Sequence, residues 1–171
     1  MRVLIPMRCT ENLDANVEKS IKAQTVNVII ELFQNTPVST CKRKGEFEGR
    51  DAIVLRAKEI DDEYVVSNES AGEHLYVDNF KCMQDKMQSD KKLGAVALWR
   101  FRGAFSKPCS EHVVGSCVMW RTKILAQMPV LNIPEIYASR ACSCMRYKDA
   151  VEALGFKMCY LDDIRRVRER G

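Results

Sequence analysis

Apolar segments of strand length and of helix length alternate along the chain, and this alternation limits the folds it can adopt. The stretch from Val26 to Phe33 is apolar and β-branched, which is typical of a buried strand. Leu13, Val17 and Ile21 instead recur every four residues, as on the buried stripe of a helix. The alternation repeats in a helix at 51–60, a strand at 63–67, a helix at 75–87 and a strand at 93–99. We therefore predict an α/β fold with a single, mainly parallel central sheet flanked by helices.

The second half of the chain continues the pattern less regularly. The sequence predicts strands at 113–120 and 156–161, with helices at 122–128 and 147–154, the last ended by Gly155. A chain of 171 residues is long enough for one domain, which we place at 1–163. Four arginines at 165, 166, 168 and 170 then predict a short basic tail at 164–171.

Charge and apolar content exclude several classes of protein. The net charge of +4 is concentrated in residues 42–44 and in the tail, and such clusters are typical of a solvated face and a frayed terminus. We expect no nucleic-acid partner. No apolar run is long enough to cross a bilayer, so we expect no transmembrane segment and a soluble, cytoplasmic protein. The sequence leaves a homodimer open.

The cysteines do not form a recognisable metal framework. There are eight cysteines and two histidines, but no CxxC pair occurs and the histidines stand far apart. A zinc site is therefore not expected. Buried free thiols and disulfides both remain open.

Ligands of open α/β sheets bind beyond the carboxyl ends of the strands. The sequence places three polar loops at such ends, at residues 7–12, 34–37 and 68–72. We therefore expect a ligand site where these loops meet.

The order of several short motifs resembles the family 2 glycosyltransferases of the GT-A type, which use nucleotide-diphosphate sugars. The similar stretches span most of the chain: Val3 to Leu13, Val17 to Thr25, Ser89 to Val96, Val114 to Arg121 and Ala153 to Lys157. The resemblance implies the GT-A fold, a nucleotide-diphosphate sugar as donor and a hydroxyl-bearing acceptor.

The resemblance also implies a divalent cation, Mn²⁺ or Mg²⁺, held after the third strand. At that position the family has an Asp-x-Asp type of motif, whereas this chain has Asn68, Glu69 and Ser70. Glu69 and Ser70 are the candidate metal ligands, and Asn68 is a candidate nucleotide-binding residue. A plain polar turn is the alternative.

The first two loops supply the other candidate nucleotide-binding residues, which are Pro6, Arg8, Glu11, Gln34 and Asn35. An arginine can bind a phosphate through two parallel hydrogen bonds. Gln34 and Asn35 stand where the family has an aspartate against the base, and an amide can both donate to and accept from a base edge. A simple Asn-Thr-Pro turn is the alternative for the second loop.

The acceptor side of the site is implied by the same resemblance. Gly115, Ser116 and Trp120 are the candidate acceptor-binding residues, although Trp120 also fits a role in the core. Glu135 is the first candidate for the general base and Asp149 the second, but the acidic pair that the family has before its last helix is missing. Either residue also fits a solvated helix surface.

Two functions remain open on these grounds. One is an inverting, metal-assisted glycosyltransferase that moves a sugar to a hydroxyl group. The other is a catalytically degenerate GT-A module that binds a nucleotide sugar or a protein. A nucleotidyltransferase is disfavoured, because the Gly-rich phosphate loop that such enzymes carry near the N-terminus is absent.

Overall fold

The structure is a computed structural model that describes residues 1–7, 12–34, 51–101, 117–129 and 143–169. The strands are β1 (Arg2–Met7), β2 (Ile29–Gln34), β3 (Tyr64–Asn68), β4 (Gly72–His74), β5 (Leu93–Phe101), β6 (Cys117–Arg121) and β7 (Lys157–Glu169). The helices are α1 (Ala15–Lys22), α3 (Asn79–Ser89), α4 (Thr122–Leu125) and α6 (Ser143–Ala153), and residues 51–57 are also helical. Within these ranges, no helix has the length and apolar character needed to cross a bilayer.

All described strands join one sheet in the order β2-β1-β3-β6-β5-β7-β4. β1 is parallel to β2 and β3, and β5 is parallel to β7, whereas β6 is antiparallel to both of its neighbours and β4 is antiparallel to β7. Strands β1, β2, β3, β5 and β7 therefore run one way, and only β4 and β6 run the other. This confirms the predicted α/β architecture with a mostly parallel central sheet.

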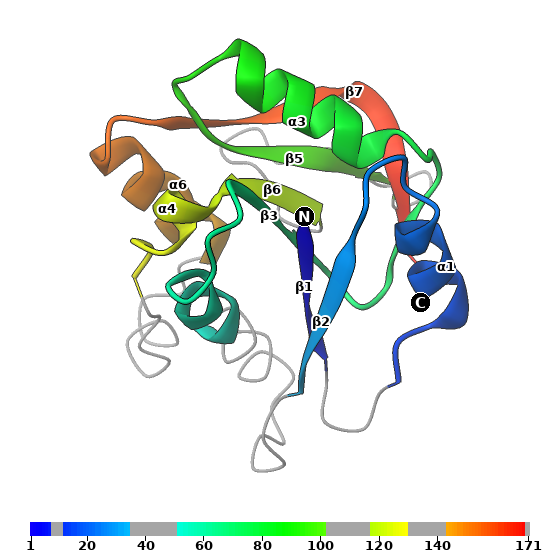
Figure 1. Ribbon diagram of the computed structural model, residues 1–171. Coiled ribbons are helices and arrows are strands. Elements are labelled where there is room, and N and C mark those ends of the chain that lie inside the picture. Colours follow the sequence, from blue (N-terminus) through cyan, green and yellow to red (C-terminus); the bar gives the residue numbers. More distant parts are fainter. Residues whose placement is uncertain (8–11, 35–50, 102–116, 130–142, 170–171) are drawn as a thin grey trace.

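Helices cover the sheet on both sides (Figure 1). Side chains of β1 alternate between the two faces: Val3 and Ile5 pack with α1 and α3, while Leu4 packs with α4, α6 and the segment 51–57. Each face has its own apolar cluster, so the sheet is buried between two helical layers. Such burial on both faces explains the continuous apolar runs of the strands in the sequence.

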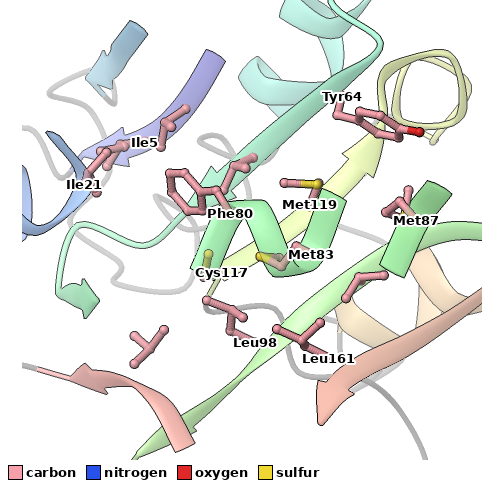
Figure 2. Close-up of a cluster of buried hydrophobic side chains, with 14 of the residues drawn as sticks. Ile5, Ile21, Tyr64, Phe80, Met83, Met87, Leu98, Cys117, Met119 and Leu161 are labelled. Carbon is pink, nitrogen blue, oxygen red and sulfur yellow. The ribbon is translucent and has the colours of Figure 1, made fainter. Parts of the chain in front are cut away.

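The cluster under α1 and α3 is centred on the helix α3 (Figure 2). Phe80, Met83 and Met87 occupy one stripe of α3, and all three side chains are fully buried. They pack toward Leu98 of β5 and Met119 of β6. All three lie on α3, within the region 75–87 where the sequence predicts a helix.

Helix α1 begins at an aspartate cap. Asp14 Oδ1 accepts hydrogen bonds from the backbone N–H of Asn16 at 2.8 Å and of Val17 at 3.3 Å. Asp14 is therefore the N-cap of α1.

We expect Asp14→Ala to lower the free energy of unfolding by about 1 kcal/mol, because two backbone donors of the first turn lose their acceptor. Urea denaturation measures the change. Asn12→Ala is the matched control, since Asn12 is exposed and precedes the cap. An equal loss in both variants would contradict the assignment of the cap.

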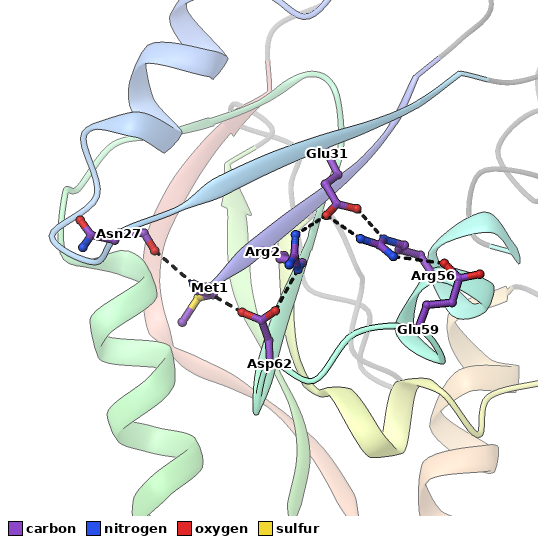
Figure 3. A network of polar contacts seen from close by, with 7 residues as sticks. All are labelled: Met1, Arg2, Asn27, Glu31, Arg56, Glu59 and Asp62. Atoms are coloured by element: carbon purple, nitrogen blue, oxygen red, sulfur yellow. Dashed lines mark hydrogen bonds and ion pairs between the residues drawn. The ribbon is translucent and has the colours of Figure 1, made fainter.

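A group of ion pairs ties β1 and β2 to the segments that precede β3 (Figure 3). Arg2 donates to Glu31 at 2.6 Å and to Asp62 at 2.9 Å, and Arg56 donates to Glu31 at 2.7 Å and to Glu59 at 3.1 Å. The hydrogen bond from Arg56 and then that from Arg2 lower the pKa of Glu31, although partial burial acts in the opposite direction. Because Arg2 opens β1, these contacts lie away from the carboxyl ends of the strands.

Two features at the far side of the sheet differ from the sequence prediction. β7 does not end at residue 161 but continues to Glu169, so residues 164–169, assigned to a tail, form the end of a strand. The unpredicted strand β4 pairs with this extension, from Gly72 opposite Glu169 to His74 opposite Val167. Val167 is fully buried and packs this extension against the core. In the sequence, the arginines on both sides of Val167 make the same segment resemble a solvated tail.

Candidate functional site

The strands predicted to carry the ligand loops end side by side. Met7 of β1 lies opposite Gln34 of β2, and β3 ends at Asn68 on the other side of β1. Cys117, the first residue of β6, lies opposite Asn68. Because β1, β2 and β3 run in the same direction, the chain leaves all three at one edge of the sheet (Figure 1). This edge is the candidate site.

Beyond β3 the chain forms a compact turn, residues 68–72, that carries the two predicted metal ligands. Asn68 Nδ2 donates to the carbonyl oxygens of Glu69 at 2.9 Å and of Gly72 at 3.1 Å, and Gly72 N also donates to Glu69 O at 3.0 Å. A Cβ on Gly72 would lie only 3.2 Å from Asn68 Nδ2 and from Glu69 O, so the close turn favours glycine. Glu69 and Ser70 are half-buried within it.

The buried imidazole of His74 supports this turn from the side of the core. His74 Nε2 lies 3.2 Å from Asn68 Oδ1, and His74 Nδ1 lies 3.0 Å from Asn79 Nδ2. The ring also meets the edge of Phe80, with 4.8 Å between ring centroids and 82° between planes. Burial lowers the pKa of His74 from 6.5 to about 3, so the ring is neutral at physiological pH.

This buried neutral histidine makes stability depend on pH. Between pH 6.5 and 3 the unfolded chain binds a proton at this residue and the folded chain does not. The free energy of unfolding should therefore fall with decreasing pH, by about 1.4 kcal/mol per unit once the pH is well below 6.5. Urea denaturation between pH 7 and 5 tests this in the wild type and in His74→Gln. The variant should lose this contribution, and equal slopes in the two proteins would contradict it.

The thiol of Cys117 lies beside the same imidazole, 4.0 Å from His74 Nε2. Burial, and then the negative charge of Glu69, raise the pKa of Cys117 above its usual range. The thiol therefore stays protonated and acts as an apolar filler under the turn rather than as a nucleophile.

The described residues do not form a complete metal site by themselves. Within those ranges, no group of three His, Cys, Asp or Glu side chains converges closely enough to hold an ion. Glu69 and Ser70 offer hard oxygen ligands, which suit Mg²⁺ or Mn²⁺, but they are too few to fill a coordination shell. The donor set therefore fits a cation that takes its remaining ligands from a bound diphosphate or from water.

The other predicted site residues are found in different environments. Trp120 is 4% exposed, its ring lies edge-on to Tyr147 with centroids 5.9 Å apart, and its Nε1 donates to Ser67 Oγ at 3.0 Å. This burial agrees with the core role that the sequence left open. Asp149 is exposed on α6, and Pro6 lies in β1 opposite Phe33.

Several predicted residues cannot be placed. The structure describes only the backbone of Gln34, and the remaining candidates lie outside the described residues: Arg8, Glu11, Asn35, Gly115, Ser116 and Glu135. Their roles stay predictions.

Sequence reasoning did not assign a role to His74. In the sequence the two histidines stand out only as possible zinc ligands, and their separation disfavours that role. A signal was available in Asn68, His74 and Asn79, three polar residues that stand next to apolar strand and helix patterns. Polar side chains buried in such a setting need hydrogen-bond partners, and these three could supply them to one another.

Comparison with protein-family profiles and with the sequences of characterised proteins gives no match. Solved structures do match. The mannosyltransferase PcManGT from Pyrobaculum calidifontis, in complex with GDP-Man and Mn²⁺, superimposes with a TM-score of 0.67 at 11% identity. Glucosyl-3-phosphoglycerate synthase from Mycobacterium tuberculosis, in complex with Mg²⁺ and UDP, gives 0.59 at 10% identity. A CMP:2-keto-3-deoxy-manno-octonic acid synthetase complexed with CTP gives 0.58 at 11% identity.

These alignments include nearly the whole of this chain but differing shares of the other proteins. They cover 98%, 99% and 97% of the chain, and 56%, 71% and 90% of the mannosyltransferase, the synthase and the synthetase, respectively. The chain thus spans little more than half the length of the mannosyltransferase. At this level of identity the similarity concerns the fold alone. The chain has the GT-A-like fold of the nucleotide-diphospho-sugar transferases.

Proposed function

We propose that the chain is a glycosyltransferase that moves a sugar from a nucleotide-diphosphate donor to a hydroxyl group, with inversion and with the help of a divalent cation. The observation that carries this proposal is the position of Glu69 and Ser70, which follow β3 at the carboxyl edge of a sheet with this fold. In support, two proteins of similar fold bind GDP-Man with Mn²⁺ and UDP with Mg²⁺.

The donor would lie along the carboxyl edge of β2, β1 and β3. Glu69 and Ser70 would hold the cation together with diphosphate oxygens, and Asn68 would keep their turn in shape. A bound divalent cation would supply positive charge to the leaving diphosphate. Arg8 would pair with a phosphate oxygen, and the amides of Gln34 and Asn35 would meet the edge of the base.

The acceptor would enter from the side of β6, where Gly115 and Ser116 precede Cys117. Glu135 is our proposed general base, with Asp149 as the second candidate. The base would take the proton of the acceptor hydroxyl while its oxygen attacks the anomeric carbon opposite the departing diphosphate. Attack from that side inverts the configuration of the sugar.

A panel of nucleotide sugars tests the proposal. UDP- and GDP-linked sugars are incubated with the protein and simple hydroxyl acceptors, with Mn²⁺ or with EDTA, and the release of nucleoside diphosphate is measured. We expect release with at least one donor, and only with the metal. Failure to bind or turn over any donor would refute the proposal. CTP and other nucleoside triphosphates form a separate arm, because release of pyrophosphate from them would indicate a nucleotidyltransferase.

A second candidate is a degenerate GT-A module that binds a donor or a protein without catalysis. It is favoured by a single carboxylate, Glu69, where the family has an acidic motif, and by the lack of a converging metal cluster within the described residues. Calorimetric binding of a donor without turnover under any acceptor would support this candidate. Catalytic turnover would exclude it.

A further inference from the structure

A continuous chain of buried hydrogen bonds links the candidate metal turn to the first residue of helix α3. It runs from Asn79 through His74 to Asn68, and Asn68 then bonds the carbonyls of Glu69 and Gly72. Asn79 is fully buried, Asn68 is 1% exposed and His74 is 6% exposed. Each member is thus shielded from water and depends on its neighbour for its hydrogen bonds.

The direction of each bond follows from the groups involved. The two protons of Asn68 Nδ2 go to the carbonyls of the turn, so its Oδ1 faces His74 and accepts. His74 must then carry its single proton on Nε2, which leaves Nδ1 to accept from Asn79 Nδ2. Turning the Asn68 amide over would point its Oδ1 at the two carbonyls and its Nδ2 at His74 Nε2–H, so these hydrogen bonds fix one orientation of the Asn68 side chain.

The end of this hydrogen-bond series that lies away from the turn is held by contacts with the helices. His74 N donates to Ser20 Oγ of α1 at 3.0 Å, and Phe80, next to Asn79, donates its backbone N–H to Gln24 Oε1 at 3.1 Å. Phe80 itself is fully buried in the apolar cluster between the sheet and the helices α1 and α3. Hydrogen bonds through His74 therefore connect the turn to the buried core.

We propose that His74 is a positioning residue for donor binding. Through Asn68 it holds the turn so that Glu69 and Ser70 face the cation and diphosphate in one geometry, and it touches neither ligand itself. This inference rests on the proposed function, since it assigns His74 to the same site. A preformed turn avoids an ordering cost when the donor binds, so its loss weakens donor affinity.

Two substitutions of His74 separate positioning from simple packing. In His74→Gln the side-chain amide N–H can replace Nε2–H and keep the bond to Asn68. In His74→Asn the shorter amide can keep the bond with Asn79 but cannot reach Asn68. Both variants remove the imidazole ring from the same core, so a purely structural role predicts similar losses of stability and no difference at the turn.

The experiment measures two properties of both variants and of the wild type. Hydrogen exchange reports the protection of the Gly72 amide without any ligand, and calorimetry reports the affinity for UDP and GDP with Mn²⁺. We expect His74→Asn to lose roughly tenfold in protection and in affinity, an effect of the size of a supporting hydrogen bond in a metal site. His74→Gln should recover most of both. In turnover assays the loss should appear mainly in the donor KM rather than in kcat.

Equal protection of the Gly72 amide in the two variants would overturn the inference, whatever the wild type binds. Equal affinities would overturn it as well. A wild type that binds no nucleotide would instead refute the proposed function and with it the donor role of His74, while the exchange data would still report whether His74 orders the turn. If His74→Asn does not fold, Asn79→Ala serves in its place, because it removes the support of His74 from the other end. Unchanged protection at Gly72 in that variant would also overturn the inference.

Discussion

If the proposed function holds, replacing Glu69 with glutamine is expected to lower metal-dependent turnover by about 100-fold or more, because the turn loses the carboxylate proposed as a ligand for the cation. Glutamine keeps the size of the side chain and its oxygen, so the turn should fold as before. The measurement is kcat for the active donor over a Mn²⁺ titration. We expect the apparent affinity for Mn²⁺ to fall together with kcat.

Glu73→Gln is the matched control for this substitution. Glu73 lies on β4 four residues from Glu69, and the change removes the same charge from the same region. Because no role in metal binding is proposed for Glu73, turnover should stay within roughly threefold of the wild type, as for a surface substitution. Similar losses of turnover in both variants would show that the negative charge of this region, rather than coordination of the cation by Glu69, accounts for the effect. Wild-type metal dependence in Glu69→Gln would contradict the assignment.

Phe80→Ala is expected to cost about 3–5 kcal/mol of unfolding free energy, the usual range for deleting a buried phenyl ring. Phe80 is fully buried at the centre of the cluster in Figure 2 and also borders the imidazole of His74. Urea denaturation gives the free energy, and thermal denaturation should show a fall in Tm of roughly 10 °C for a domain of this size. Leu55→Ala is the control, since Leu55 is 50% exposed and its loss should change stability by less than about 0.5 kcal/mol. Comparable losses in the two variants would contradict the described core.

Much of the fold could be predicted because local patterns and burial agree. The buried face of α1 follows from the spacing of Val17 and Ile21, and the apolar runs of β1 and β5 follow from burial on both faces of the sheet. Errors arose where a local pattern was extended too far. The sequence predicts a helix from residue 75 onward, but Leu75 is 40% exposed and precedes α3, which begins at Asn79.

The strands β4 and the end of β7 could not be predicted, because each depends on the other. Gly72–His74 is too short to show a period, and the arginines before Glu169 resemble a solvated tail. Their pairing joins residues far apart in sequence, and only the sheet brings them together. Long-range pairing of this kind leaves no local signal.

The sequence could predict where the strands next to the candidate site end, but not how the side chains there are directed. Strand order alone brings the loops after β1, β2 and β3 to one edge, and the structure places Met7, Gln34 and Asn68 there. The direction of each side chain depends on packing instead. Asn68 forms hydrogen bonds within its own turn and with His74, and Trp120 points into the core. The sequence predicts neither orientation.

The most direct test of the account is calorimetric titration of the protein with UDP and GDP, in Mn²⁺ and in EDTA. We expect saturable binding of at least one nucleoside diphosphate in Mn²⁺, weakened by roughly tenfold or more when the cation is removed, because in the proposed site the single carboxylate Glu69 leaves ligand positions that the diphosphate would fill. An absence of binding for both nucleotides in Mn²⁺ would contradict the claim that the edge beyond β1, β2 and β3 is a nucleotide-sugar site.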